Sequence, residues 1–232
     1  MKDRGWFLNL KENKKKHSDN CKELELTNEQ TDMLKEFGNI GSGNAATALS
    51  NLLNKFVEMS LTSINIVPFW KIPYFFKNEK IKVFGISSKI EGEYEFNLLQ
   101  IYPKDAIIKI INNLTDFEKV DSKKINIIEN LDDFSLSIIV EMGNILTGHY
   151  SSALANLLST KLIPDVPKIA LDYISALTNC IIAKYSELLD FTILIGTSLS
   201  IEDIELTAAL CFIPSVETIY RFSEYISTKY NF

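Results

Sequence analysis

The chain contains one helical segment twice, 105 residues apart. The stretch EFGNIGSGNAATALSNLL, residues 36–53, aligns without a gap with EMGNILTGHYSSALANLL, residues 141–158. Ten of the 18 aligned positions carry the same residue. Such a repeat constrains the fold strongly, because both copies must form the same element within one architecture. We therefore expect a single domain over residues 25–232, built from two repeats at about 25–115 and 130–232.

The segments around the repeat predict an α/β fold. Runs rich in β-branched and aromatic residues predict strands at 56–67, 82–90, 94–102, 191–199 and 204–213. Helices are predicted from Pro103, over 131–158, from Pro167 to about Tyr185 and from Pro214, with a polar linker at 115–130. We expect a pseudo-two-fold axis to relate the two long helices across a shared, mainly antiparallel sheet.

Charge and composition exclude several classes of function. The net charge is −6, and residues 1–22 alone carry +4, which leaves −10 for the rest. We expect residues 1–24 to be a basic, flexible tail, and the acidic remainder argues against nucleic-acid binding. No apolar run approaches the ~18 residues that span a bilayer. Three cysteines without metal-ligand spacing fit reduced thiols, so we expect a cytoplasmic protein without membrane insertion.

Placing the repeat on a helix, at about 100° per residue, separates two faces. In the first copy, Asp32, Glu36 and Asn39 share one side. The opposite side is apolar and carries Leu34, Phe37, Gly41, Ala45, Ala48 and Leu52. The second copy repeats this division, with Ser137, Glu141 and Asn144 facing outward against Ile139, Met142, Leu146, Ala153 and Leu157. Packing does not require an exposed Glu and Asn at the same place in both copies.

Two interpretations of the Glu-x-x-Asn pair stay open at this point. The pair can simply solvate a helix face, or it can act on a partner. It lacks the second carboxylate of a glycosidase and the ligand number of a metal site. A carboxamide, however, donates and accepts hydrogen bonds at once, and GTPases use a Gln to orient the water that attacks a phosphoryl group. The pattern therefore favours completion of another protein's active site.

The glycines do not form a phosphate-binding loop. GNIGSGN lacks the G-x-G-x-x-G spacing after a strand, and no Lys-Ser or Lys-Thr follows as a Walker A loop requires. Only Gly38 and Gly43 recur in the second copy. Their expected role is close backbone approach, either of the helix to the sheet or of the helix to a partner.

With these residues in view, the chain resembles the CheC/CheX/FliY family of chemotaxis phosphatases, and most of all its CheC branch. The shared pattern is Asp or Ser, then Glu, then Asn, with a Pro 23 positions after the Asn. Ser137, Glu141, Asn144 and Pro167 match it fully, whereas Thr62 stands at the Pro position of the first copy. The resemblance covers about residues 25–232 and implies the pseudo-two-fold fold of that family.

The resemblance also implies a function. Asn39 or Asn144 would orient the water that hydrolyses the aspartyl phosphate of a phosphorylated CheY-type response regulator, and Glu36 or Glu141 would pair with the regulator's Lys. Asp32, Ser137 and Pro167 would support the motifs. The chain would need no cofactor of its own, because the Mg²⁺ would belong to the regulator. The receptor deamidase CheD is a further expected partner, with Asp172 as the candidate contact.

Two alternatives to an enzyme remain open on the sequence alone. One is a non-catalytic adaptor that binds the regulator or CheD, and a fainter one is a component of the flagellar switch.

Overall fold

The computed structural model describes residues 28–76, 80–114, 119–185, 191–202 and 204–215, together with residue 218. The N-terminal tail predicted at 1–24 lies outside these residues, as does nearly all of the helix predicted to follow Pro214. The boundaries predicted for the two repeats, about 25–115 and 130–232, stay predictions.

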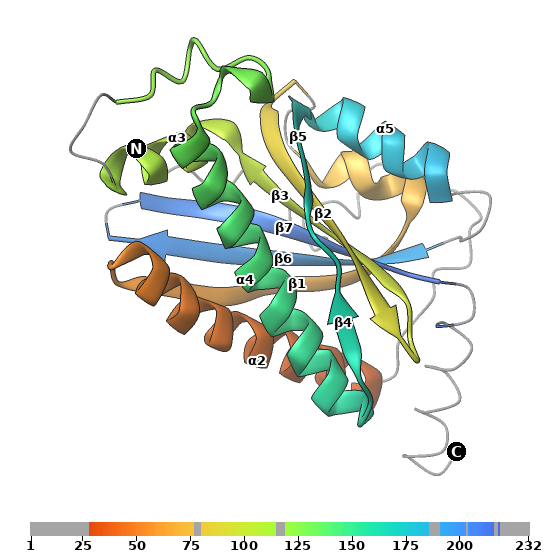
Figure 1. Cartoon of the computed structure of the whole chain (residues 1–232). Coiled ribbons are helices and arrows are strands. Elements are labelled where there is room, and N and C mark those ends of the chain that lie inside the picture. Colours follow the sequence, from red (N-terminus) through yellow and green to blue (C-terminus); the bar gives the residue numbers. More distant parts are fainter. Residues whose placement is uncertain are drawn as a thin grey trace.

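The described strands form one seven-stranded antiparallel sheet (Figure 1). They are β1 (Val57–Pro68), β2 (Lys82–Gly92), β3 (Phe96–Pro103), β4 (Leu162–Pro164), β5 (Lys168–Tyr173), β6 (Phe191–Ile201) and β7 (Ile204–Pro214). The order is β1-β6-β7-β3-β2, with β4 and β5 both paired to β2. Strand β1 of the first half pairs with β6, which forms a hairpin with β7 in the second half. Strands β4 and β5 of the second half pair with β2, which forms a hairpin with β3 in the first half. The two halves are therefore interlocked.

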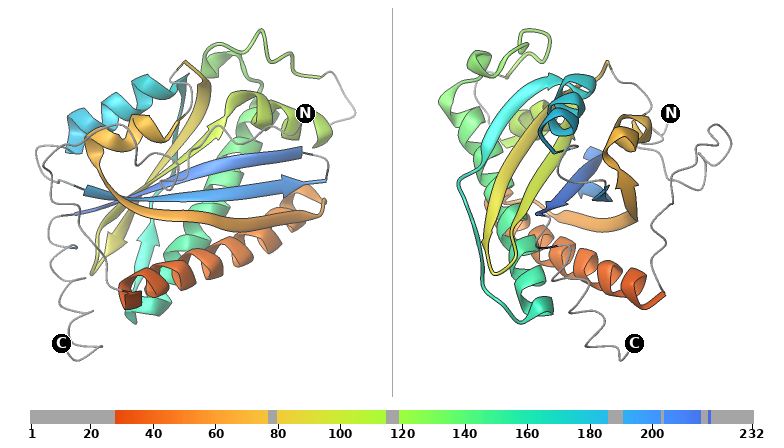
Figure 2. Two further views of the ribbon diagram at one scale, coloured as in Figure 1. Left: turned by 180° about the vertical axis from the view of Figure 1, so that it is seen from behind. Right: turned by 90° about the vertical axis from the view of Figure 1, so that its right-hand side faces the viewer.

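Helices cover both faces of the sheet (Figure 2). The two motif helices, α2 (Asn28–Leu53) and α4 (Asp133–Leu158), pack on one face and against each other, and α3 (Lys104–Leu114) joins this layer. The 3₁₀ helix η1 (Phe69–Phe75) and helix α5 (Ile174–Tyr185) cover the other face, and a short turn, η2 (Ile128–Asn130), precedes α4. The predicted architecture is confirmed.

Strand β7 shows how one sheet serves two apolar layers. Ala208, Leu210 and Phe212 belong to the layer under α2 and α4, whereas Ala209, Cys211 and Ile213 belong to the layer under η1 and α5. Successive side chains point to opposite faces, so a strand buried on both sides is apolar throughout. Cys211 is a buried free thiol whose pKa burial raises to about 12, while Cys180 on α5 is exposed.

The two motif helices have equal length and matching ends. Both contain 26 residues, and their first and last residues are offset by 105, as in the sequence repeat. Each is followed by a residue in the left-handed region, Asn54 with φ of 47° and Ser159 with φ of 53°. The next amide bonds back to the last turn, from Lys55 to the Ser50 carbonyl and from Thr160 to the Ala155 carbonyl. Both helices therefore end in the same Schellman-type cap.

A single row of residues across the sheet locates the pseudo-two-fold axis. Register partners run in the order Ile64, Ile195, Leu210, Gln100, Ile86 and Ile169, from β1 to β5. The row reads as Ile, Ile, Leu and then Gln, Ile, Ile, and its end residues, Ile64 and Ile169, are again 105 apart. The axis therefore passes between Leu210 and Gln100, and Gln100 is the one polar residue of the row.

The prediction of one helix from Pro167 to about Tyr185 was wrong in its first part. Residues 168–173 form strand β5, and α5 begins only at Ile174. Ile169 and Leu171 alternate with exposed residues, and the segment pairs with β2 from Lys82 to Ser87. Pairing with the edge of β2 supplies hydrogen bonds that helix propensity alone cannot anticipate. The alternation itself was a strand signal in the sequence.

Candidate functional site

Helix α2 presents its three motif residues to solvent. Asp32, Glu36 and Asn39 are exposed, while Leu34 and Phe37 are 2% exposed and lie in the core. With the described residues, neither Glu36 nor Asn39 forms a hydrogen bond or an ion pair. The predicted division of this helix into an outward polar face and an inward apolar face is confirmed.

Helix α4 presents Ser137, Glu141 and Asn144 in the same way, and all three are exposed. The Asn144 amide donates to a Glu141 carboxylate oxygen over 3.4 Å, which is long for a hydrogen bond but places the two groups side by side. The Ser137 hydroxyl bonds to the Phe134 carbonyl of its own helix at 2.7 Å. The Glu and Asn side chains can therefore meet one ligand together.

The two sites differ in charge beside the motif. At the first site the Lys35 ammonium pairs with the Asp32 carboxylate at 3.0 Å, and both side chains are largely exposed. The corresponding residues of the second site are Val140 and Ser137, which carry no charge. An exposed ion pair of this kind contributes little to the stability of the fold. Its effect is on the electrostatic potential that a docking partner meets near Glu36.

Two of the repeated glycines bring the helices close to the sheet. A Cβ on Gly38 would lie 3.1 Å from the Leu61 side chain, and one on Gly143 would lie 2.7 Å from that of Ile86. At Gly143 a side chain would force Ile86 to move, whereas at Gly38 Leu61 would have to shift by a few tenths of an ångström. For Gly38 and Gly143 the approach is therefore from helix to sheet, one of the two roles expected from the sequence.

A buried polar network holds α4 to the sheet directly beneath its motif. The amide of Gln100, which is fully buried, donates to the Gly143 carbonyl at 2.9 Å and to the Thr147 hydroxyl at 2.8 Å. The Tyr102 hydroxyl donates to the Gln100 amide oxygen at 2.8 Å. Burial raises the pKa of Tyr102 far above its ordinary value, so this phenol stays protonated as a donor. Gly143 precedes Asn144, so the network fixes the backbone that carries the motif amide.

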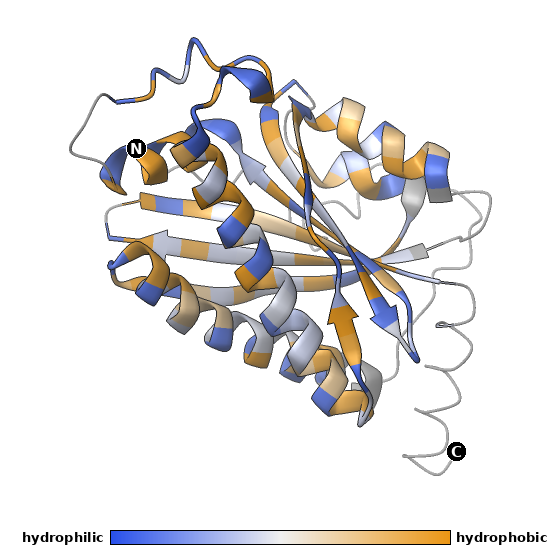
Figure 3. Ribbon diagram, viewed as in Figure 1, coloured by the Kyte–Doolittle hydropathy of each residue, from blue (hydrophilic) through white to orange (hydrophobic). Residues whose placement is uncertain are grey.

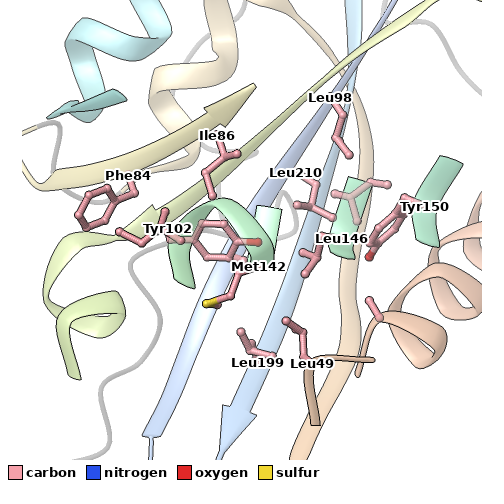
Figure 4. Close-up of a cluster of buried hydrophobic side chains, with 14 of the residues drawn as sticks. Leu49, Phe84, Ile86, Leu98, Tyr102, Met142, Leu146, Tyr150, Leu199 and Leu210 are labelled. Carbon is pink, nitrogen blue, oxygen red and sulfur yellow. The ribbon is translucent and has the colours of Figure 1, made fainter. Parts of the chain in front are cut away.

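The first site rests on different contacts. The symmetry position of Gln100 is Leu210, which forms no polar bond through its side chain. Here the Ser42 hydroxyl shares a hydrogen bond of 2.8 Å with the Tyr150 hydroxyl of α4. The Tyr150 ring also lies edge-on to Phe37, with 5.6 Å between ring centroids. Figure 4 shows Tyr150 in the layer with Leu146, Leu210 and Leu49. Helix α2 is therefore held mainly through α4 and apolar packing.

Asp132 sets the start of α4. Its carboxylate accepts from the Ser135 amide at 2.7 Å and from the Ser135 hydroxyl at 2.9 Å. The bond from the Ser135 amide has the largest effect and lowers the pKa of Asp132 below its ordinary value, and the bond from the hydroxyl lowers it further. Desolvation raises the pKa, but by less than the amide bond lowers it. An N-cap of this kind satisfies a free amide of the first turn and fixes where the helix begins.

The strands that follow the two motifs differ at the position where the first half has Thr62 and the second has Pro167. In β1 the register shifts between Leu61 and Ser63, so Thr62 lies at a bulge within a continuous strand. In the second half the strand is interrupted between Pro164 and Lys168, and Pro167 is buried in that gap. Proline has no amide proton for a sheet ladder, which accounts for an interruption there and a continuous strand at Thr62.

Asp172 lies on strand β5 at the edge of the sheet, and not on a helix as predicted. Its carboxylate accepts from the Tyr173 amide at 2.7 Å, immediately before α5 begins. The side chain is exposed. The residue is therefore accessible, at a strand-to-helix junction.

Within the part of the chain that the structure describes, every helix is too short or too polar to cross a membrane. No three His, Cys, Asp or Glu side chains of these residues gather closely enough to hold a metal ion.

Figure 3 shows hydrophilic bands recurring along α2 and α4 between hydrophobic ones. The motif groups thus lie on exposed helix faces, and a Glu and an Asn placed there can act only on a molecule that docks against them.

Comparison with known proteins gives the family. CheC from Bacillus subtilis strain 168, described as a CheY-P phosphatase, is 32% identical over 178 residues, which cover 75% of this chain and 81% of that protein. This chain belongs to the CheC-like family. The sequence model of that family matches residues 29–60 and 134–171, two segments whose starting residues are again 105 apart.

Two further relatives extend this membership. The flagellar motor switch phosphatase FliY of the same Bacillus strain is 28% identical over 148 residues, or 63% of this chain and 37% of FliY. The crystal structure of FliY from Thermotoga maritima superposes with a TM-score of 0.66 at 20% identity, over 89% of this chain and all of that one. At this identity the structural likeness shows the shared fold.

Gln100 was not among the residues singled out from the sequence. A glutamine within an apolar strand was visible there, but only the sheet register shows that it lies beneath Gly143.

Proposed function

We propose that this CheC-like protein hydrolyses the aspartyl phosphate of a CheY-type response regulator, by inserting a Glu and an Asn from a motif helix into the regulator's active site. The observation that carries the proposal is the Glu-x-x-Asn pair, exposed at equivalent positions of α2 and α4. The description of the Bacillus relative as a CheY-P phosphatase supports the choice of substrate.

The Asn amide is the group that acts on water. Its oxygen accepts a hydrogen bond from the water while its NH₂ donates to a phosphoryl oxygen, which aligns the water with the phosphorus atom. The water oxygen then bonds to phosphorus and the bond from phosphorus to the aspartyl oxygen breaks. Inorganic phosphate leaves, the proton of the attacking water passes to the phosphate or to solvent, and the regulator keeps its aspartate as a free carboxylate. Asn39 and Asn144 supply orientation, so most of their effect belongs on kcat.

The Glu carboxylate fixes the docking. Glu36 and Glu141 are exposed acids one helical turn before each Asn, where each can pair with the lysine of the regulator's active site. The Mg²⁺ that neutralises the phosphoryl group belongs to the regulator, and this chain supplies no cofactor. Asp32 and Ser137 support the motif from the preceding turn, and Pro167 shapes the strand that follows the second motif.

A non-catalytic adaptor is the second candidate, binding either the regulator or the receptor deamidase CheD. The exposed Asp172 at the end of β5 is the proposed CheD contact, since it lies on an accessible sheet edge away from both motifs. An adaptor binds one regulator per site and stops, whereas an enzyme turns over.

The test is dephosphorylation of a CheY-type regulator from the same genome, phosphorylated with acetyl phosphate and mixed with a tenth of its amount of this protein. The variants are Asn39→Ala, Asn144→Ala and the double variant. Asn51→Ala and Asn156→Ala are matched controls, because these exposed asparagines also occupy equivalent positions of α2 and α4.

The wild type and both controls should clear the excess phospho-regulator. The double variant should lose ~10²-fold or more in rate, because it lacks both orienting amides. Full activity in the double variant would show that other residues act on the water. Tight binding without turnover by the wild type would identify an adaptor.

A further inference from the structure

We infer that Gly43 and Gly148 form the part of each docking surface on which the backbone of the phosphorylated regulator rests, an inference that depends on the proposed function. Both glycines lie in the interior of a motif helix, four residues after Asn39 and Asn144. Both copies of the repeat keep them, although neighbouring positions change.

Packing among the residues that the structure describes does not account for these glycines. A Cβ added to Gly43 or to Gly148 meets no atom of the described residues within 4 Å. At Gly38, Gly41 and Gly143, by contrast, a Cβ would come within 3.1 Å of a neighbouring side chain. Glycine is the least favourable helix residue apart from proline, so alanine would serve an open position better. The described residues leave that space open to a docking partner.

The position of the glycines on the helix indicates the occupant. Residues four apart lie on the same face, about 6 Å along the helix axis, so each glycine is the next residue on the Glu-Asn face. The Asn side chain is short, and its amide reaches a phosphoryl group only if the helix backbone lies close to the rim of the regulator's active site. A side chain one turn further on would hold the helix away from that rim.

An exposed apolar side chain beside the motif supports a protein partner. Ile40, next to Asn39, is 44% exposed, whereas Ile145 at the equivalent position of the second copy is half-buried and packs against the core. A large apolar residue exposed beside the first motif fits a surface that is covered in a complex. Both surfaces then contain Glu, Asn and Gly, with the glycine as the point of closest approach, and the first surface also contains Ile40.

The test measures how substitution of each glycine changes both the thermal stability of the protein and its KM for the regulator. Gly43→Ala is made in the Asn144→Ala background and Gly148→Ala in the Asn39→Ala background, so that each site is read alone. Gly→Leu variants at the same positions add bulk. Asn51→Ala is the control, because it also improves helix propensity. Asn51 lies twelve residues beyond Asn39, about 18 Å along the helix axis, so the substitution should not touch the docked regulator.

Each alanine should raise the thermal midpoint by about 2–4 °C, since it favours the helix and meets no neighbour. The same variants should raise KM with little change in kcat, and Gly→Leu should lower kcat/KM by ~10²-fold. Unchanged KM in all the glycine variants would overturn the inference while leaving the proposed function intact. The proposed function itself stands or falls with the double Asn variant.

Discussion

The motif helices α2 and α4 are alike on their outer faces and different on their inner ones. Outside, both carry Glu, Asn and Gly at the same spacing, and both end in the same cap. Inside, α4 is bonded to the sheet through Gln100, whereas α2 lies over apolar Leu61 and Ile64 and bonds to Tyr150 of α4. An inner face needs only filled volume and satisfied polar groups, which different residues can provide.

The contact between the two helices shows how volume is shared. The Tyr150 ring packs on Gly41, where a Cβ would lie 2.7 Å from the ring. The residues at the equivalent positions are Ala45 for Tyr150 and Leu146 for Gly41. Both large residues therefore lie on α4 and both small ones on α2, so this contact does not follow the two-fold symmetry.

The largest expected effect comes from removing the Tyr150 ring. Tyr150→Ala should lower the free energy of unfolding by about 3–5 kcal/mol, because it leaves a cavity between the helices. Urea unfolding followed by far-ultraviolet circular dichroism measures this. Adding Gly41→Leu should restore part of the loss, since the pair then resembles Ala45 and Leu146. A loss below about 1 kcal/mol would show that the ring does not join the helices.

Gln100→Leu tests whether the polar network serves one site alone. It should cost about 1–3 kcal/mol, because the Tyr102 hydroxyl and the Gly143 carbonyl lose a buried partner. Activity should fall ~10-fold in the Asn39→Ala background, where only the second site works, and hardly change in the Asn144→Ala background.

Tyr102→Phe supplies the control for that variant. The pair Gln100→Leu and Tyr102→Phe removes the orphaned hydroxyl, so stability should recover while the second site stays slow. Equal losses of activity in both backgrounds would instead mean that Gln100 supports the whole sheet.

Two nearby glycines on α2 should respond in opposite directions. Gly41→Ala should destabilise by about 1 kcal/mol, because the clash with Tyr150 outweighs the gain in helix propensity. Gly43→Ala should stabilise by about the same amount, since its Cβ enters open space. Thermal unfolding of the two variants gives the sign of each change in stability. If both variants were stabilised, or both destabilised, the packing described for one of the two glycines would be wrong.

The smallest effect concerns the start of α4 and depends on pH. Asp132→Ala should cost about 1 kcal/mol at pH 7, whereas Asp132→Asn keeps an acceptor and should cost less. The pKa of Asp132 is lowered in the folded state, so its contribution is full above the unfolded value, about 4, and is lost as pH falls through the folded value. Unfolding curves at pH 7 and pH 3 should show the difference between wild type and Asp132→Ala shrinking in acid.

Much of the site was predictable because it depends on helix periodicity. The exposure of Glu36, Asn39, Glu141 and Asn144 follows from the spacing of apolar residues in two copies of one segment. The strand ranges followed in the same way from β-branched runs. Strand β5 was missed, because six residues at a sheet edge form a strand only when β2 is there to pair with them.

The duplication, the two motif faces and the family with this fold can all be read from the amino-acid order, since they depend on spacing and periodicity along the chain. Which glycines touch the sheet and which face open space depends instead on how the strands pack. Gly38 and Gly43 are both kept in the second copy of the repeat, but a Cβ would meet strand β1 at Gly38 and no described residue within 4 Å at Gly43. Likewise Gln100 became part of the second site only when the register of β3 placed it under Gly143.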